Sequence, residues 1–504
     1  MAETTIVIAL ELKTLSLVAQ KKDRRYSMIL RHWETESSRV ADDMMLRRWH
    51  RAFAEVCLTS RKIILTFGVI AMTSTMIAPA RMNTAVATVV SRPRVVAVES
   101  GSAPAEIGGK YSKIISAAVD DSGDVAFSAT LSDSSASSAI LLKSGDNTRV
   151  LLRAGDKAPD GSTYKTFGEL DRSFYGYNGA QFALLLFRAE LEGGTASEGL
   201  FLMKPDSVQT IALAGDKSPR ALTYKSFAQP TLIAERGDRG GGYYLAFLAF
   251  MEGGKKSIVS TSDIFAPEEL TTGDQLGEKE VQDFVISQCG GEAVSALTDL
   301  LDLNSGATFK EVILVGGNII SGSNFRTKGR IEPLGKVKKI LSPPAIGFQV
   351  SIASVIFKGG INAVVLRDVL GSAIVVGETG DSAPGVSNET LQAFGPPIAN
   401  VDFPWPVDTP RPPSGIVSAV KLSGGRSALW LWVRRFPGIG FPPPETKLVL
   451  VEGDTTTDGQ VIRSFAPVKL SNNGTVLLRG TVGDGAVVQE GLLITGGLFE
   501  GSTN

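Results

Sequence analysis

The chain has 504 residues, of which 43% are hydrophobic and 20% are charged, with 54 glycines and 24 prolines. This length and apolar content exclude a disordered protein and leave room for several domains or one large repeat architecture. Residues 88–504 carry 38 Lys and Arg against 44 Asp and Glu, and such a mildly acidic body gives no electrostatic footprint for nucleic acid, so we expect no nucleic-acid partner.

Residues 1–87 differ in composition from the rest of the chain. They hold one glycine, one proline and seven of the nine methionines, with 13 Lys and Arg against 8 Asp and Glu. Residues 63–72 form an apolar run that follows a basic pair and precedes small residues, which is the order of a secretory signal. Because the run is short for a membrane span, we expect cleavage between residues 80 and 87; an uncleaved anchor is the alternative.

This leader is unusually long. The Met-Met pair at residue 44 precedes a basic stretch and would make a more ordinary start, so we interpret residues 1–43 as a mispredicted extension or a long leader. The alternative is a helical pair over residues 8–60, where leucines recur near helical spacing. We therefore expect a leader over residues 1–87 and a repeat domain over residues 88–504.

Cleavage at this site would remove both histidines, His32 and His50, together with Cys57. The exported chain would keep Cys289 alone, so it could form no internal disulfide. Without histidine, Ser-His-Asp catalysis, Cys-His catalysis and His-coordinated zinc are excluded. We expect neither a cofactor nor a metal.

A Gly-Asp turn recurs along residues 88–504. Its clearest copies, residues 154–167 and 214–227, align without a gap. The turn glycines of all copies fall at 101, 155, 215, 273, 316, 380 and 453, at intervals of 43 to 73 residues. An aspartate in such a turn can accept bonds from nearby backbone N–H groups, which we favour over a ring of carboxylates for Ca²⁺ or a cationic ligand. The residues assigned to this structural role are Gly155, Asp156, Gly215, Asp216, Gly273, Asp274, Gly380, Asp381, Gly453 and Asp454.

Each repeat contains short apolar segments in which small and large residues alternate, the pattern of β-strands. Units of four such strands predict an all-β fold, a seven-bladed β-propeller. Six or eight blades are alternatives, because an interval of 43 residues is short for four strands. After residue 453 only three segments follow, whereas residues 94–99 form a fourth-strand pattern with no preceding three. We therefore expect the two ends to pair and to close the ring.

The Gly-Asp turn followed by G-x-V-A-F-x-A resembles the tandem-repeat family of exported bacterial proteins known by an N-x-x-G-x-x-A-F motif. The resemblance covers residues 92–504. Residues 120–127 carry Asp where the motif has Asn, and residues 471–478 depart from the motif at both ends. The resemblance implies export and repetition, and it brings no established reaction and no catalytic residue.

Two aromatic, proline-rich insertions interrupt the sixth interval, and neither belongs to the repeat. In an antiparallel meander both connections emerge on one face, and proline keeps such loops stiff. The candidate ligand-binding residues are Phe403, Trp405, Phe436 and Phe441. The alternative is that these side chains pack on each other and cap the blade.

Two further motifs have structural and functional alternatives. Trp430 and Trp432 share one strand face, and we expect them to pack between blades rather than to form an exposed platform. Residues 120–124 have the oxygen density of a calcium loop but lack the distal glutamate of an EF-hand, so a turn is favoured.

The function predicted from these observations is a non-catalytic binding or interaction propeller. We expect it to be secreted or held in the cell envelope, in the periplasm or at the cell surface, as a monomer with no stable membrane span after cleavage. Its expected ligand is an unknown protein or a polysaccharide. The alternative is an extracellular hydrolase or lyase that uses non-histidine residues in the central channel.

Overall fold

The computed structural model divides the chain into two units, Met1–Met82 and Asn83–Asn504. The predicted leader over residues 1–87 lies outside the residues that the structure describes. The described residues are 92–177, 180–234, 236–237, 243–262, 267–276, 278–286, 294–306, 308–315, 337–340, 345–346, 350–357, 361–368, 373–400, 414–434, 445–484, 487–496 and 498–499.

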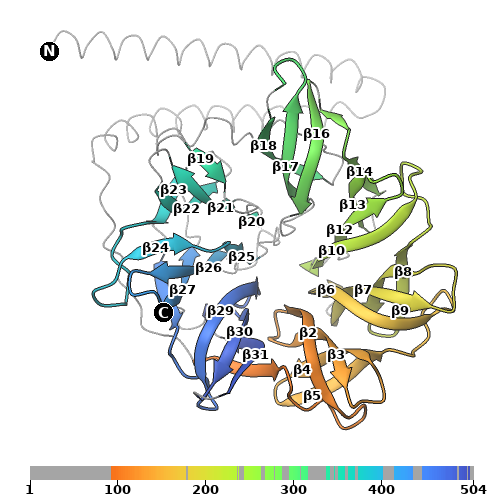
Figure 1. The fold of residues 1–504 in the computed structure, drawn as a ribbon, viewed down its shortest axis with the longest axis horizontal. Helices are drawn as coiled ribbons and strands as arrows, with labels where there is room; N and C mark the ends of the chain where they lie inside the picture. Colours follow the sequence, from red (N-terminus) through yellow and green to blue (C-terminus); the bar gives the residue numbers. More distant parts are fainter. Residues whose placement is uncertain are drawn as a thin grey trace, which may run out of the picture. The chain divides into compact units, whose positions relative to one another are not determined.

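These residues form seven sheets and no helix (Figure 1). The first sheet contains β2 (Lys110–Val119), β3 (Val125–Ser132), β4 (Ser138–Ser144) and β5 (Asn147–Arg153). The second contains β11 (Arg236–Gly237), β6 (Thr163–Tyr177), β7 (Ala180–Glu192), β8 (Glu198–Lys204) and β9 (Ser207–Leu213). The third contains β10 (Tyr224–Ala234), β12 (Tyr243–Met251), β13 (Lys256–Ser262) and β14 (Glu268–Thr271).

The remaining four sheets follow in chain order. The fourth contains β15 (Gln275–Leu276), β16 (Lys279–Ile286), β17 (Val294–Asp302) and β18 (Thr308–Val315). The fifth contains β19 (Val337–Ile340), β21 (Val350–Phe357), β22 (Asn362–Asp368) and β23 (Ala373–Glu378), with β20 (Ala345–Ile346) beside β21. The sixth contains β24 (Leu391–Phe394), β26 (Ser414–Leu422), β27 (Ser427–Arg434) and β28 (Glu445–Val451), with β25 (Ile398–Ala399) beside β26. The seventh contains β29 (Val461–Leu470), β30 (Val476–Gly483), β31 (Val488–Thr495) and β1 (Arg94–Val98).

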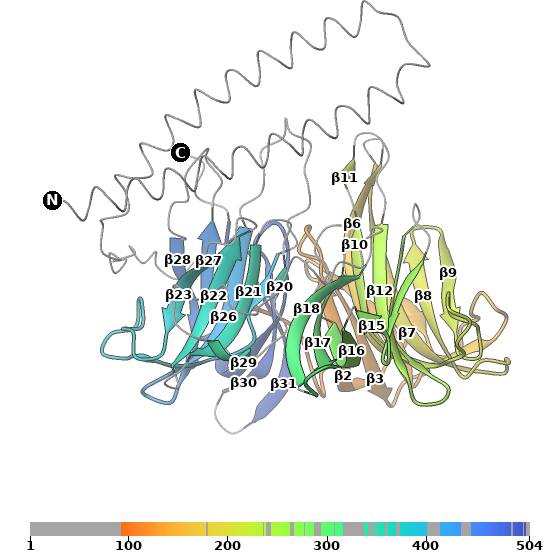
Figure 2. The ribbon, with the colours of Figure 1, turned by 90° about the horizontal axis from the view of Figure 1, so that it is seen from above.

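Among the described residues, all strand pairs are antiparallel except one. The short strand β11 pairs in parallel with the end of β6, with Arg236 opposite Gly176. Figure 2 shows β11 beside the projecting end of β6. The antiparallel pattern follows from the short connections between successive strands, which suffice for hairpins but not for parallel crossovers.

The seventh sheet joins the two ends of the described chain. β1 pairs with β31, with Arg94 opposite Ile494 and Val98 opposite Gly491. This is the pairing that the missing fourth strand of the last repeat predicted. The N-terminal strand therefore supplies the fourth strand of the C-terminal sheet.

Polar contacts from other parts of the seventh sheet also connect it to the first and second sheets. Lys469 of β29 forms an ion pair with Asp171 of β6, across to the second sheet. Arg479 Nη2 donates a hydrogen bond of 2.6 Å to the carbonyl of Ile114 in the first sheet. Asn472 N–H donates to the Asp121 carboxylate at 2.9 Å. The seventh, first and second sheets are thus connected through contacts between residues about 300 or more positions apart in the sequence.

Neighbouring sheets pack together through apolar clusters. Such clusters join the first sheet to the second, the second to the third, the third to the fourth, the fifth to the sixth, the sixth to the seventh, and the seventh to the first. Trp430 and Trp432 are 1% and 3% exposed and share a cluster with Val364 of the fifth sheet. Both tryptophans therefore pack between sheets, as the sequence predicts.

The five Gly-Asp pairs form one kind of turn between successive sheets. Their glycines have φ between +91° and +103°, where a residue with a side chain would be strained. Each following aspartate accepts a backbone N–H from three residues earlier, at 2.7 to 3.1 Å. Each carboxylate therefore accepts a bond within its own turn, and that of Asp274 also pairs with Arg220 of the preceding turn.

The first copy of this turn is displaced by one residue from the predicted position. Ser100 has φ of +67° and donates its N–H to the Tyr111 carbonyl, the bond that a turn glycine makes elsewhere. Gly101 stands in the aspartate's place, so its assignment as the turn glycine is wrong. The Ala-Pro pair gives the correct alignment, because it begins two residues after Gly101 and two residues after Asp156.

The interval from residue 273 to residue 316 is not a whole repeat. β16 pairs with β17, and β17 pairs with β18, which ends at Val315. The two-residue strand β15 lies within the turn region, so β18 corresponds to the third strand of the other repeats and not to the strand that leads into a turn. Gly316 itself lies outside the described residues. The short interval is therefore no longer a reason to expect six or eight repeats.

No helix that could cross a membrane occurs in the part of the chain that the structure describes. Within the same residues, no three His, Cys, Asp or Glu side chains are grouped so as to hold a metal ion.

The turn predicts a measurable stability difference at Asp454, whose Oδ2 accepts the Val451 N–H at 2.7 Å. Asp454→Ala should lower the free energy of unfolding by about 1 kcal/mol, because it leaves this partly buried donor unpaired. Asp454→Asn keeps an oxygen acceptor and should lose less than half as much. Urea unfolding of the three proteins tests this; equal midpoints for Asp454→Ala and the unsubstituted protein would show that the turn does not need the carboxylate.

Candidate functional site

The site residues predicted from the sequence fall into two groups, the aromatic residues of the two insertions and the Gly-Asp pairs of the turns. Phe403, Trp405, Phe436 and Phe441 lie outside the described residues, and so does Cys289. Their two insertions connect β25 to β26 and β27 to β28. The five Gly-Asp pairs lie in separate turns, and each carboxylate accepts a backbone N–H of its own turn, so they form no common site.

The oxygen-rich turn at residues 120–124 holds a protein cation. Asp120 is 3% exposed, and its Oδ2 lies 2.6 Å from Arg172 Nη2 of the second sheet. Its Oδ1 accepts the N–H groups of Ser122 and Asp124 at 2.9 and 3.2 Å. Burial raises the pKa of Asp120, and the charge of Arg172 opposes that rise. The turn therefore ties the first sheet to the second.

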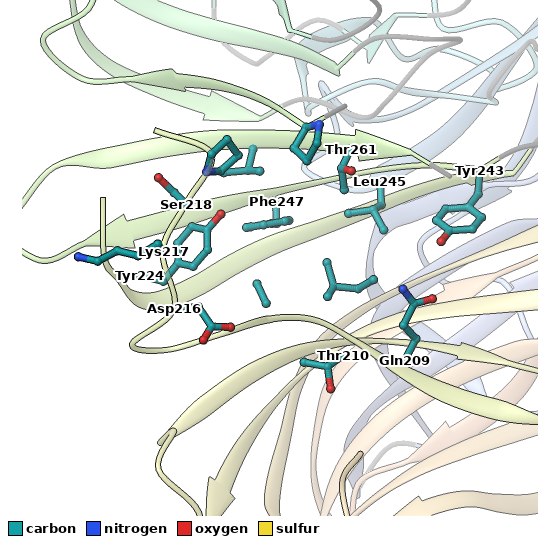
Figure 3. Close-up of a pocket in the computed structure, with 15 residues that line it drawn as sticks. Gln209, Thr210, Asp216, Lys217, Ser218, Tyr224, Tyr243, Leu245, Phe247 and Thr261 are labelled. Carbon is teal, nitrogen blue, oxygen red and sulfur yellow. The ribbon is translucent and has the colours of Figure 1, made fainter. Parts of the chain in front are cut away.

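A groove between the second and third sheets is the candidate ligand site (Figure 3). It encloses about 470 Å³, between β9 on one side and β12 and β13 on the other. Figure 3 shows Gln209 and Tyr243 at one end, Asp216, Lys217 and Ser218 at the other, and Leu245 and Phe247 between them. A volume of this size can hold a small ligand or one or two units of a polymer.

The groove exists because the third strand of the third sheet carries small side chains. Aligning the repeats places Val259 and Thr261 of β13 at the positions of Phe201 and Met203 of β8. Phe201 is fully buried against the first sheet, and Met203 packs on the same cluster. Two smaller side chains at the next interface leave the space open.

Apolar side chains and hydrogen-bonding groups both line the groove. Leu245, Phe247 and Val259 are nearly fully buried and form its apolar part. Gln209 and Thr261 contribute an amide and a hydroxyl that have no hydrogen-bond partner among the residues described. With no partner among the described residues, these groups can form hydrogen bonds to a ligand that lies on the apolar surface.

Tyr224 adds a hydroxyl group to this lining. Burial, together with the nearby carboxylates of Glu269 and Asp216, raises the pKa of Tyr224 above its ordinary value. The hydroxyl therefore stays protonated at neutral pH. Because Tyr224 has no side-chain hydrogen bond to any other described residue, this hydroxyl can both donate to and accept from a ligand.

The charged groups at the turn end of the groove already form hydrogen bonds within the turn. Asp216 Oδ2 accepts the Leu213 N–H at 3.1 Å. Lys217 Nζ donates to the Thr223 hydroxyl at 2.6 Å. They carry opposite charges on adjacent residues, so this end of the groove has little net field.

The sequence carries a signal for this groove in the third strand of each repeat, although no groove was predicted there. Comparing the third strands, G-L-F-L-M at residues 199–203 against S-I-V-S-T at residues 257–261, shows a loss of side-chain volume at two inward positions. The pairing pattern that makes those positions face the preceding sheet comes from the structure.

Comparisons with known proteins give a family match but no activity. A model for a family of unknown function, DUF7453, matches residues 53–273. No curated protein matches the chain. A lectin from Aleuria aurantia in complex with Fucalpha1-6GlcNAc is 10% identical, covers 76% of this chain and 94% of its own, and has a TM-score of 0.27. A neuraminidase-like protein of A/flat-faced bat/Peru is 11% identical, with coverages of 71% and 96% and a TM-score of 0.27. TM-scores of this size fall short of a shared fold, so the architecture rests on the sheets of this chain.

The origin of the groove predicts opposite effects at two equivalent positions. Phe201→Val should lower the free energy of unfolding by about 2 to 3 kcal/mol, because it opens a cavity in a packed interface. Val259→Phe should leave the free energy of unfolding unchanged or raise it by up to about 1 kcal/mol, because the added ring enters existing space. Thermal unfolding tests the pair; an equal loss in both variants would mean that the space beside Val259 is not open.

Proposed function

We propose that residues 92–504 form a closed seven-bladed β-propeller and that the protein is an exported, non-catalytic binding protein. The proposal for the fold is supported by the seven sheets, by the six apolar clusters that join neighbouring sheets, and by the pairing of β1 with β31. The proposal for export is supported by the apolar run at residues 63–72 and its flanking residues.

The groove between the second and third sheets carries the functional proposal. Its apolar surface, with an aromatic ring at Tyr243, suits the C–H face of a sugar ring. The free amide of Gln209 and the hydroxyls of Thr261 and Tyr224 suit the sugar's hydroxyl groups. A polysaccharide is therefore the ligand class that this lining favours over an unknown protein.

Binding without turnover is the activity that the described side chains favour. The carboxylate and the amine that line the groove, Asp216 and Lys217, are held by the backbone and by a neighbouring hydroxyl. Groups used in this way hold the turn rather than transfer protons to a ligand. The alternative of a hydrolase or lyase would need reacting groups elsewhere.

Filling the groove should weaken polysaccharide binding. The double variant Val259→Phe with Thr261→Met gives β13 the bulk that β8 has, and polysaccharide affinity should fall about tenfold or more because the ring of a sugar no longer fits. Lys225→Gln, an exposed position on β10 that does not line the groove, serves as the control and should bind normally. The measurement is affinity electrophoresis in gels that contain a panel of polysaccharides.

Two outcomes would contradict the proposal. Full binding by the filled variant would place the ligand outside the groove. Release of reducing ends from a bound polysaccharide by the purified exported protein would make it an enzyme.

A further inference from the structure

We propose that the Tyr243 end of the groove selects an acidic sugar, one that carries a carboxylate, through the side chain of Lys204. This inference rests on the proposed function, because it names the class of sugar that the same groove would bind.

Lys204 lies at the end of β8, next to the groove. Its Nζ is 5.5 Å from the centroid of the Tyr243 ring, which lines the groove. No carboxylate within the described part of the chain lies within ion-pair distance of Lys204. The ammonium group therefore lies beside an aromatic ring with no carboxylate partner among the described residues, and a cation held in this way can bind an anionic ligand.

The pairing of β8 with β9 places a second donor near this cation. Lys204 lies opposite Ser207, and Leu202 lies opposite Gln209. Residues opposite each other in a sheet share a face, so Lys204 and Gln209 are diagonal neighbours on one face. Leu202 belongs to the cluster between the second and third sheets, which shows that this face looks toward the groove.

A cation, an amide and an aromatic ring thus converge at one end of the groove. A carboxylate can pair with the ammonium and accept from the amide while the sugar ring lies against the apolar surface. The opposite end offers no comparable unmatched charge, since Asp216 and Lys217 are adjacent and oppositely charged. The charge asymmetry therefore sets both the class of the sugar and the end at which its carboxylate lies.

The equivalent position of the first sheet lacks this cation. Aligning β4 with β8 places Ser144 where Lys204 stands. The repeat therefore does not require a lysine at this position, and its location beside the open groove supports a role in ligand binding.

Two forms of one polymer test the proposal on the full exported chain. Polygalacturonate carries a carboxylate on each unit, and its methyl ester carries none. The unsubstituted protein should bind polygalacturonate about tenfold more tightly than the ester, and the preference should shrink as salt is added. Lys204→Gln should lose the preference while keeping the affinity for the ester, and Lys225→Gln should keep both.

Equal affinity for the two polymers, or a preference that persists in Lys204→Gln, would overturn the acidic-sugar proposal and leave the groove as a sugar site. Binding of neither polymer, nor of any other polysaccharide, by the unsubstituted protein would overturn the proposed function instead. Binding of polygalacturonate that the filled groove variant retains would assign the anion to another surface.

Discussion

The pairing of β1 with β31 is the constraint on which the other sheets depend. Without β1, β31 would be the outer edge of the seventh sheet, and an unpaired edge invites contact with other chains. With β1 in place, Val96 and Ala97 pack with Ile494 in the cluster between the seventh and first sheets. The strand therefore completes one sheet and fixes its neighbour. The polar contacts of Lys469 in β29 and Arg479 in β30 also hold the seventh sheet against its neighbours.

Local features of this chain could be predicted from the sequence because they depend on special backbone or side-chain chemistry. A turn that requires φ near +100° needs glycine at 155 and 215, and an aspartate beside it supplies the acceptor. The same logic failed at Gly101, because Ser100 adopts the positive φ there. Aligning Gly101 with the turn glycines of the other copies therefore shifted this copy by one residue. The candidate groove was not predicted, because it depends on space that two small side chains leave unfilled. Such space can be recognised only when the sheet that faces those side chains is known, and the sequence alone does not show which sheet that is.

A repeat architecture allows one unit to change while the others keep the fold. Phe201 and Met203 fill their interface, whereas Val259 and Thr261 leave theirs open. The backbone bonds are the same in both cases, since the Gly-Asp turns before β6 and β10 make equivalent contacts. Stability is carried by the shared turn and by the other apolar clusters. The third sheet can therefore carry the proposed ligand site without loss of the fold.

A designed cross-link between Ala97 and Leu492, which lie opposite each other in β1 and β31, tests the closure most directly. The measurement is made on the full-length chain with Ala97→Cys and Leu492→Cys, after Cys57 and Cys289 are replaced by serine. Closure predicts that mild oxidation gives an intramolecular disulfide between these positions, found by mass spectrometry of the digested monomer, and a higher unfolding temperature than in the reduced protein. Two free thiols after oxidation, or a disulfide found only between two molecules, would contradict it.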